Sequence, residues 1–431
     1  MAGSYTCEQL GKLASVQGGY AFKSDDFTDS GVPVLKIKNV RHREIDAWEV
    51  EYVSKEVARA NCRYFCKTGD ILISMTGSWP QAPSSVVGRV ARFVGPSDTY
   101  LINQRVGRIV IKEPRKLNLR FLFYVLTQSE IQWHLVSIAT GSANQANISG
   151  SQIESLDIPL PPLPEQRAIT HILGTLDDKI ELNRRTNETL ETMARAIFKS
   201  WFVNFDPVRA KAEGRDPDLP KPLADLFPDS LEESELGRIP ATWRIVKLGD
   251  LIDLVYGKAL KEENRQPGSV AVYGSNGQVG WHNARLAGGP GIIVGRKGNP
   301  GVVTWIPTDF FAIDTTFYVV PKAECSSLYF LFYALRGHGL GSLGADSAVP
   351  GLNRSMVYRS KQLVPSTAVL HAFDHRVRPL FDRIHAGGQQ SLLLAELRDA
   401  LLPRLISGKL RVHEMGTRLK EACTMKGKAP G

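Results

Sequence analysis

The sequence is poor in cysteine and has no long apolar run. Its five cysteines are Cys7, Cys62, Cys66, Cys325 and Cys423, an odd number scattered over 431 residues. Sparse cysteines are typical of a reducing compartment and argue against a disulfide framework. No stretch approaches the roughly 18 uninterrupted apolar residues of a membrane-spanning helix, and the first residues lack a signal-peptide pattern. We therefore expect a cytoplasmic protein that does not contact a membrane.

Catalytic and nucleotide-binding motifs are also absent. The sequence has no Gly-x4-Gly-Lys-Ser/Thr loop, and its glycine-rich run 288–301 lacks the Gly-x-Gly-x-x-Gly spacing of a phosphate-binding turn. His371 and His375 are four residues apart, a spacing that can bind metal, but no Glu follows His371 and no third ligand lies nearby. We expect this chain to carry no catalytic residue, no metal and no cofactor.

The charge balance is basic. The formal net charge is +9 and the isoelectric point about 9.2. An excess of positive charge favours a polyanionic partner such as nucleic acid, and by itself it is a mild indication. The length allows two to four domains, each large enough to bury its own core.

Four short motifs occur twice in the same order. Residues 10–13 return as 248–251, 69–74 as 289–294, 121–126 as 330–335, and 148–161 as 352–365. In each copy, short β-type runs broken by Gly, Pro and Ser lead to a proline-marked boundary and then to a long helical pattern. The repeat predicts two domains of common origin, each followed by a helix.

This organisation divides the chain into six parts. We predict globular domains at 1–160 and 243–365, long helices at 161–205 and 366–411, a connector rich in proline and charge at 206–242, and a disordered tail at 412–431. The connector is expected to hold at most short helical turns.

Both helices carry a heptad pattern. In the first helix the two lines are Ile169, Leu176, Asn183, Leu190 and Leu173, Ile180, Asn187. A shift of 204 residues gives Phe373, Leu380, Leu394, Leu401 and Val377, Ile384 in the second helix, with Gly387 and Ser391 in the places of the two asparagines. Such lines are typical of a coiled coil with a polar layer. Each helix could instead cap its own domain, but we favour an antiparallel pair that separates the two domains.

The boundary motifs resemble a known family. Gly141-Ser142, Asn147-Ile148-Ser149 and residues 158–169 (IPLPPLPEQRAI) closely resemble the end of a target recognition domain and the start of the central helix in type I restriction–modification specificity subunits. Residues 201–212, 226–230 and 235–240 are similar to the segments that follow in that family. The resemblance covers nearly the whole chain except the tail. It implies an α+β fold: two mixed α/β target recognition domains separated by two long helices that form an antiparallel coiled coil, with a pseudo-two-fold internal repeat.

The resemblance also implies a function. Such a subunit binds a bipartite, asymmetric double-stranded DNA target, one half-site per recognition domain, while the helices set the spacer and dock two methyltransferase subunits. These methylate adenine N6 with S-adenosylmethionine, and two restriction/translocase subunits cut unmethylated DNA with ATP and Mg, so all cofactors would lie on partner subunits. One departure concerns residues 365–370 (PSTAVL), which lack the proline-rich run and the Glu165-Gln166 pair of the first boundary.

Two other classes of function stay open at this point. A self-contained restriction or modification enzyme with a divergent active site would need an Asp/Asn-Pro-Pro-aromatic motif or its equivalent. Asn299-Pro300-Gly301 is the nearest approach and departs from it at the third and fourth places. A two-headed scaffold that binds only protein is disfavoured by the basic charge.

The candidate DNA-contacting residues form clusters in both domains. Base readout needs forked donors and acceptors on exposed loops, and positioning needs Lys and Arg near phosphates. In the first domain the candidates are Lys36, Lys38, Asn39, Arg41 and Arg43, with Thr76, Ser78 and Gln81 on a following loop. In the second domain they are Ser275, Asn276, Gln278, Arg296, Lys297 and Asn299. For any single Lys or Arg among them, a solvated surface charge is the alternative.

Overall fold

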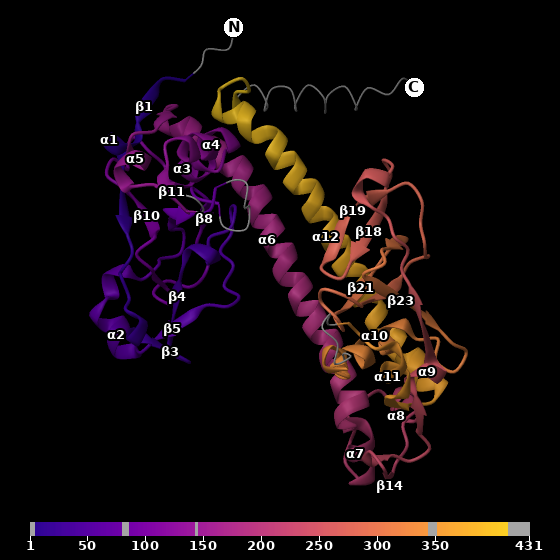
Figure 1. Ribbon diagram of the computed structural model, residues 1–431. Coiled ribbons are helices and arrows are strands. Elements are labelled where there is room, and N and C mark those ends of the chain that lie inside the picture. The colour runs from indigo at the N-terminus through magenta and orange to yellow at the C-terminus, as the bar shows by residue number, and fades with distance from the viewer. Residues whose placement is uncertain (1–4, 80–85, 143–144, 344–350, 413–431) are drawn as a thin grey trace, which may run out of the picture. The chain divides into compact units, whose positions relative to one another are not determined.

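Two long helices, α6 (Leu163–Lys199) and α12 (Thr367–Ile406), run through the fold (Figure 1). The computed structural model describes residues 5–79, 86–142, 145–343 and 351–412. Its first unit comprises Met1–Ile180 and Leu393–Gly431, and its second unit comprises Glu181–Leu392. Each long helix therefore contributes one part to each unit.

The start of α6 follows from its prolines. Proline lacks a backbone N–H and is tolerated in the first helical turn, where that donor would be unpaired. Pro164 occupies such a place, and the Pro162 carbonyl accepts hydrogen bonds from the amides of Glu165 and Gln166. The helix continues as a π-helical turn, η5 (Ser200–Asn204), and ends at Phe205, which adopts a left-handed conformation with φ 60°.

The centre of the first unit is an antiparallel sheet in the order β2-β10-β6-β8. Its strands are Ala14–Gly18, Val106–Ile111, Ile71–Ser74 and Val90–Arg92. All four residues of β6 are buried, as expected of a central strand. Helix α3 (Leu119–Leu126) belongs to the same core cluster, and the Asn118 side chain caps its first turn.

The remaining elements of the first unit surround this sheet. A second sheet has the order β3-β5-β4-β9: Phe27–Thr28, Glu51–Val53, Val32–Leu35 and Leu101–Ile102. Smaller sheets pair β1 (Cys7–Gln9) with β13 (Asp157–Pro159), and β11 (Thr140–Ser142), β12 (Gln145–Asn147) and β7 (Thr76–Gly77). The short helices are α1 (Leu10–Leu13), η1 (Ser24–Asp26), η2 (Ile37–Asn39), α2 (Lys55–Ala60), η3 (Cys62–Tyr64), α4 (Ser129–Ser137) and α5 (Gly150–Glu154).

The second unit is also built on a four-stranded antiparallel sheet, in the order β17-β23-β20-β21. Its strands are Ile252–Tyr256, Thr316–Pro321, Gly291–Gly295 and Val303–Ile306. All five residues of β20 are buried. Helix α10 (Leu328–Gly337) belongs to the adjoining core cluster, and the Ser327 side chain caps its first turn.

Three smaller sheets complete the second unit. They pair β19 (Gly277–His282), β18 (Val270–Gly274) and β22 (Phe310–Ala312); β16 (Arg244–Lys247) and β24 (Lys361–Val364); and β14 (Leu231–Ser234) and β15 (Gly237–Pro240). The short helices are α7 (Asp206–Ala212), α8 (Lys221–Ala224), α9 (Leu248–Leu251), η6 (Glu262–Asn264), η7 (Leu340–Ser342) and α11 (Arg354–Arg359). The mixed helix and strand content predicted from the sequence is confirmed.

Segment 206–242 is more ordered than expected of a connector. It contains α7, α8 and the β14–β15 hairpin, and its Val208, Phe227 and Ile239 are buried in the core cluster of the second unit. These apolar residues stand singly among prolines and charges in the sequence, where no periodic pattern reveals them. The expected disordered tail lies outside the described residues from residue 413 onward.

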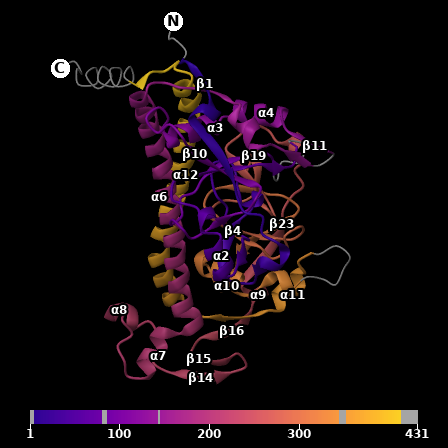
Figure 2. The same cartoon turned by 90° about the vertical axis from the view of Figure 1, so that its left-hand side faces the viewer.

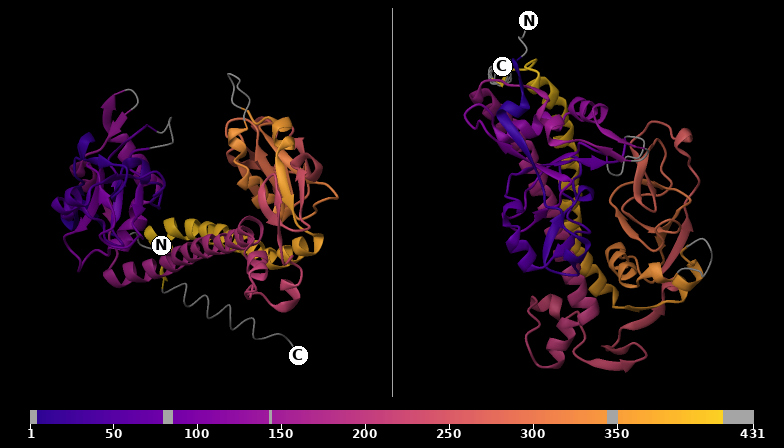
Figure 3. Two further views of the ribbon diagram at one scale, coloured as in Figure 1. Left: turned by 90° about the horizontal axis from the view of Figure 1, so that it is seen from below. Right: turned by 60° about the vertical axis from the view of Figure 1, so that its left-hand side comes forward.

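The helices contact each other within each unit. In the first unit the early part of α6 lies beside the late part of α12 (Figure 2), where Ile169 and Leu173 share a buried cluster with Leu402 and Leu405. In the second unit the late part of α6 lies beside the early part of α12 (Figure 3), and Phe198 packs 6.1 Å from Phe373 between ring centres. In both units, rising residue numbers on α6 meet falling numbers on α12, so the helix segments run antiparallel.

Candidate nucleic-acid interface

In the second unit, two predicted loops lie together. The turn between β18 and β19 carries Ser275 and Asn276, and the turn between β20 and β21 carries Asn299. Asn299 Nδ2 donates a hydrogen bond of 2.8 Å to Asn276 Oδ1. Gly277 and Gly298 have φ angles of 106° and 80°, which only glycine adopts readily, so both turns depend on these residues. Asn276, Gln278, Lys297 and Asn299 are exposed and offer amide and ammonium groups to a ligand.

A basic and aromatic cluster lies next to these turns. The Arg296 guanidinium lies 4.8 Å from the centre of the Tyr256 ring and donates a 3.0 Å hydrogen bond to the Asp314 carbonyl. Arg354 lies 5.0 Å from the same ring centre, and Tyr256 is 47% exposed. Sequence reasoning found Arg296 but missed Tyr256 and Arg354, because they are far from each other and from Arg296 in the chain. Stacked arginine and an exposed ring can contact phosphates and bases.

In the first unit, the predicted cluster 36–43 is mostly engaged in internal contacts. Lys36 forms an ion pair with Glu51, and its Nζ lies 4.0 Å from the centre of the Phe27 ring. Asn39 is buried. Its Oδ1 accepts a hydrogen bond of 2.9 Å from the backbone N–H of Lys36, and its Nδ2 donates one of 2.8 Å to the Asp46 carbonyl. These two residues therefore hold the turn around η2.

The other members of this cluster differ in exposure. Lys38 is exposed, and Arg41 lies 3.4 Å from the Asp46 carboxylate. Arg43 Nη1 donates a 2.7 Å hydrogen bond to Asp399 of α12, and its side chain is 13% exposed. Arg43 is thus bound to the helix rather than presented to solvent.

The loop after β6 shows a similar division. Thr76 is buried, and its hydroxyl donates to Asn147 Oδ1 at 2.7 Å. Ser78 is partly buried and forms a β-bridge with Val86. Gln81 lies outside the described residues.

None of the predicted seam residues is exposed. Ile169, Leu173, Asn183, Phe373 and Val377 are buried, and Leu176, Ile180, Asn187, Leu190, Leu380, Ile384, Leu394 and Leu401 are partly buried.

The polar residues predicted in the middle of the two long helices contact one another in the second unit. Asn183 Nδ2 lies 3.2 Å from Ser391 Oγ and 2.9 Å from Gln390 Oε1, and Asn187 Nδ2 donates to the Ile384 carbonyl at 3.2 Å. A Cβ on Gly387 would lie 2.7 Å from Asn187 Oδ1, so a larger residue here would displace the Asn187 side chain from its present position.

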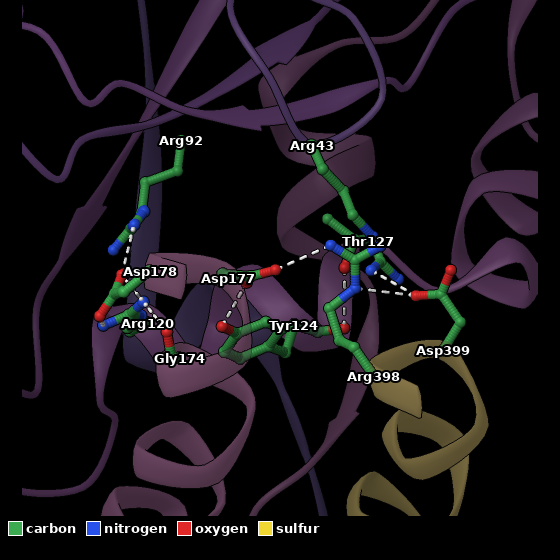
Figure 4. Close-up of polar contacts among 10 residues, drawn as sticks. All are labelled: Arg43, Arg92, Arg120, Tyr124, Thr127, Gly174, Asp177, Asp178, Arg398 and Asp399. Carbon is green, nitrogen blue, oxygen red and sulfur yellow. Dashed lines mark hydrogen bonds and ion pairs between the residues drawn. The ribbon is translucent and has the colours of Figure 1, made fainter. Parts of the chain in front are cut away.

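A chain of alternating charges crosses the first unit between the globular part and the helices (Figure 4). Tyr124 Oη donates to Asp177 Oδ2 at 2.5 Å, and Arg398 Nη1 donates to Asp177 Oδ1 at 2.8 Å. Asp399 Oδ1 then accepts from Arg398 Nε at 2.9 Å and from Arg43 Nη1 at 2.7 Å. We call these five residues the ionic chain; they come from α3, α6, α12 and the turn after η2.

A second ionic group lies beside it on α6. Arg120 of α3 binds Asp178 through both terminal nitrogens, at 2.6 and 3.2 Å, and Arg92 of β8 lies 3.5 Å from the same carboxylate (Figure 4). Burial disfavours the ionised carboxylate, but the hydrogen bond and charge of Arg120 outweigh it and hold the pKa of Asp178 below its usual value. In the same way, hydrogen bonding to Arg398 and the charge of Arg43 overcome burial and lower the pKa of Asp399.

No cluster of three or more His, Cys, Asp and Glu side chains that could hold a metal ion occurs in the part of the chain that the structure describes. Across those same residues, no helix has both the length and the apolar character needed to cross a bilayer.

Comparison with known proteins finds relatives over most of the chain. Residues 5–192 match the family described as the type I restriction modification DNA specificity domain. The chain is 26% identical over 413 residues to the type I restriction enzyme HindI specificity subunit of Haemophilus influenzae, covering 80% of this chain and 87% of that protein. It is 24% identical over 444 residues to the type I restriction enzyme MjaIX specificity subunit of Methanocaldococcus jannaschii, covering 95% and 94%.

The fold agrees with these matches. The crystal structure of the S subunit of a type I restriction–modification system from M. genitalium superposes with a TM-score of 0.57 at 18% identity, covering 93% of this chain and 96% of that chain. The chain is thus similar, over most of its length, to type I restriction–modification specificity subunits. This confirms the resemblance predicted from its boundary motifs.

Proposed function

We propose that this chain is the DNA specificity subunit of a type I restriction–modification complex and binds a bipartite, asymmetric target through one half-site per recognition domain. The observation that carries the proposal is the similarity to specificity subunits over 95% of the chain. The basic net charge of +9 suits a DNA-binding role.

The two recognition domains would be copies of one ancestral unit. Motifs that repeat in the sequence lie on elements with the same surroundings: α1 and α9 precede the first strand of each central sheet, and α3 and α10 each follow the second strand of the sheet order. Antiparallel contacts between α6 and α12 within each unit support a coiled coil as the separator. We assign residues 1–160 and 243–365 to the two recognition domains, and 161–205 and 366–411 to the helices.

Half-site readout is assigned to exposed loops. In the second domain the β18–β19 and β20–β21 turns present Asn276, Gln278, Lys297 and Asn299, joined by Arg296 stacked on Tyr256. In the first domain Lys38 and Arg41 are the corresponding candidates, together with Ser78 and with Gln81, which lies outside the described residues. The internal contacts of Lys36, Asn39 and Thr76, described above, hold the backbone next to these residues in place.

The helices would also dock partners. Leu182 and Met193 of α6 are 55% and 49% exposed, and apolar side chains on a charged helix favour coverage by another subunit. We assign to partner chains the adenine-N6 methyltransferase activity, the ATP-dependent endonuclease activity, and the S-adenosylmethionine, ATP and Mg that they require. Two methyltransferase and two restriction/translocase subunits complete the assembly, which would act in the cytoplasm.

One experiment separates this function from an enzyme and from a protein-binding scaffold. The purified chain, alone and with its methyltransferase partner, is incubated with random-sequence DNA, and bound sequences and methyl transfer are measured. We expect a split target recovered with the partner, and methylation only when the partner is present. Methyl transfer by the chain alone would establish the enzyme, and absence of sequence-specific binding in both samples would contradict the proposal.

A further inference from the structure

The ionic chain joins segments that are far apart in the sequence. Arg43 lies in the turn after η2, Tyr124 on α3, Asp177 on α6, and Arg398 and Asp399 on α12 (Figure 4). Two cations and two anions alternate along it, so no net charge is left uncompensated. The side chains of Arg43 and Arg398 are each 13% exposed and that of Asp177 is 18% exposed, so water screens the contact between Asp177 and Arg398 little. Asp399 is 55% exposed, so its two contacts are screened more and act mainly through their direction.

The conformation of Arg43 costs free energy. Arg43 has φ 69°, a left-handed conformation that costs a residue with a side chain about 1 kcal/mol or more. Within the described residues its buried Nε has no hydrogen-bond partner. The turn is held in this state by the Arg43 amide, which donates to the Val90 carbonyl at 2.8 Å, and by the bond to Asp399. A feature that costs free energy and nevertheless points at one carboxylate suggests a geometric role.

Buried ion pairs often add little stability, and in some proteins they specify the geometry of the elements that they join. Bringing charges out of water costs much of what their attraction returns, whereas their directional bonds permit few alternative arrangements. Apolar packing alone would let the globular part of this unit shift slightly on the helices. The ionic chain contacts α6 and α12 together, so its directional bonds constrain how that part lies against both helices.

We propose that the ionic chain sets the placement of the first recognition domain on the helices and thereby the spacer length at which its half-site is accepted. This inference rests on the proposed function. Asp399 is the positioning residue, because it accepts from both Arg43 and Arg398 and so joins the recognition domain to α12.

DNA geometry makes spacer length a sensitive readout. One added base pair moves a half-site by about 3.4 Å and rotates it by about 35° around the duplex axis. A domain held rigidly on its helices cannot follow both changes. A domain released from Asp399 could turn enough to accept the altered spacing.

The test uses the complete chain with its methyltransferase partner and DNA targets whose spacer is the native length or one base pair longer or shorter. For Asp399→Asn, we expect the preference for the native spacer to fall about tenfold, equivalent to about 1.4 kcal/mol, while the preferred bases of both half-sites stay the same. Asp399→Glu keeps the charge and should retain most of the preference.

The matched control is Glu188→Gln on α6. Glu188 pairs with Arg184 of the same helix at 2.5 Å, and its side chain is 62% exposed, close to the 55% of Asp399. The control should leave the spacer preference unchanged. Equal loss of binding at all three spacers in Asp399→Asn, or an unchanged preference, would overturn the inference. If the wild-type complex itself binds no split target, the proposed function fails and the inference falls with it.

Discussion

Each unit places a tyrosine of its core helix against the long helices, but the surroundings of the two tyrosines differ. In the first unit Tyr124 donates to Asp177. The motif that contains Tyr124 returns with Tyr333, and a shift of 204 residues places Phe381 at the position of Asp177. There the Tyr333 and Phe381 ring centres are 6.1 Å apart, and within the described residues the buried Tyr333 hydroxyl has no hydrogen-bond partner.

Several aromatic rings pack against Phe381. Its ring centre lies 4.8 Å from that of Trp305 and 5.0 Å from that of Tyr329, and Phe332 completes the group. Ala194 stands in the register position of Arg398, so neither Asp177 nor Arg398 has a polar equivalent that could satisfy Tyr333. The junctions around these two tyrosines therefore differ: directional charges surround Tyr124, whereas aromatic rings surround Tyr333. Elsewhere in the second unit, Arg336 of α10 pairs with Glu191 of α6.

The largest loss of stability is expected for a substitution in the aromatic junction around Phe381 in the second unit. Phe381→Ala removes a nearly buried ring and leaves a cavity among Trp305, Tyr329, Phe332 and Tyr333, which should lower the free energy of unfolding by about 3–5 kcal/mol. Denaturant unfolding followed by tryptophan fluorescence measures this directly. Leu393→Ala on the same helix, at a 65% exposed position, is the control and should change stability little.

Asp177→Ala is the corresponding change in the ionic chain of the first unit. It leaves the buried Arg398 guanidinium without Asp177 and the Tyr124 hydroxyl without its acceptor, so we expect a loss of about 3 kcal/mol. Asp177→Asn keeps the shape and an acceptor for Tyr124 and should cost less. If the alanine variant were as stable as wild type in the same unfolding assay, charge would not hold this junction.

Removing the two hydroxyls distinguishes the junctions more finely. Tyr124→Phe loses a hydrogen bond to a charged group and should destabilise the protein by about 1.5 kcal/mol, whereas Tyr333→Phe removes an unpaired buried hydroxyl and should be neutral or stabilising by about 1 kcal/mol. Thermal unfolding of both variants under one condition gives the comparison. Equal losses in the two variants would mean that Tyr333 has a partner in solution.

The sequence predicted the pattern of this molecule better than its contacts. Heptad spacing and repeated motifs are periodic signals, so the two helices and the polar layer at Asn183 and Asn187 could be read from them. Arg43 was assigned to DNA because a basic run looks the same whether it faces solvent or a helix. Its partner Asp399 is 356 residues away, and only the fold brings them together. Tyr256 and Arg354 were missed in the second unit for the same reason.

The smallest expected effect concerns acid. The pKa of Asp178 is lowered in the folded state, so its ionic contacts stabilise the protein above the ordinary carboxyl pKa of about 3.9 and are lost as the pH falls through the lower folded value. Because Asp178 is 58% exposed, the contribution is modest. The stability difference between wild type and Asp178→Asn, measured by unfolding from pH 7 down to pH 3, should shrink toward the acid end.

The second unit offers the contrast, because the junction around Phe381 is built of uncharged rings and Phe381→Ala should cost the same free energy over this range. If the stability difference between wild type and Asp178→Asn stayed constant from pH 7 to pH 3, the ionic contacts of Asp178 would not contribute to the stability of the first unit.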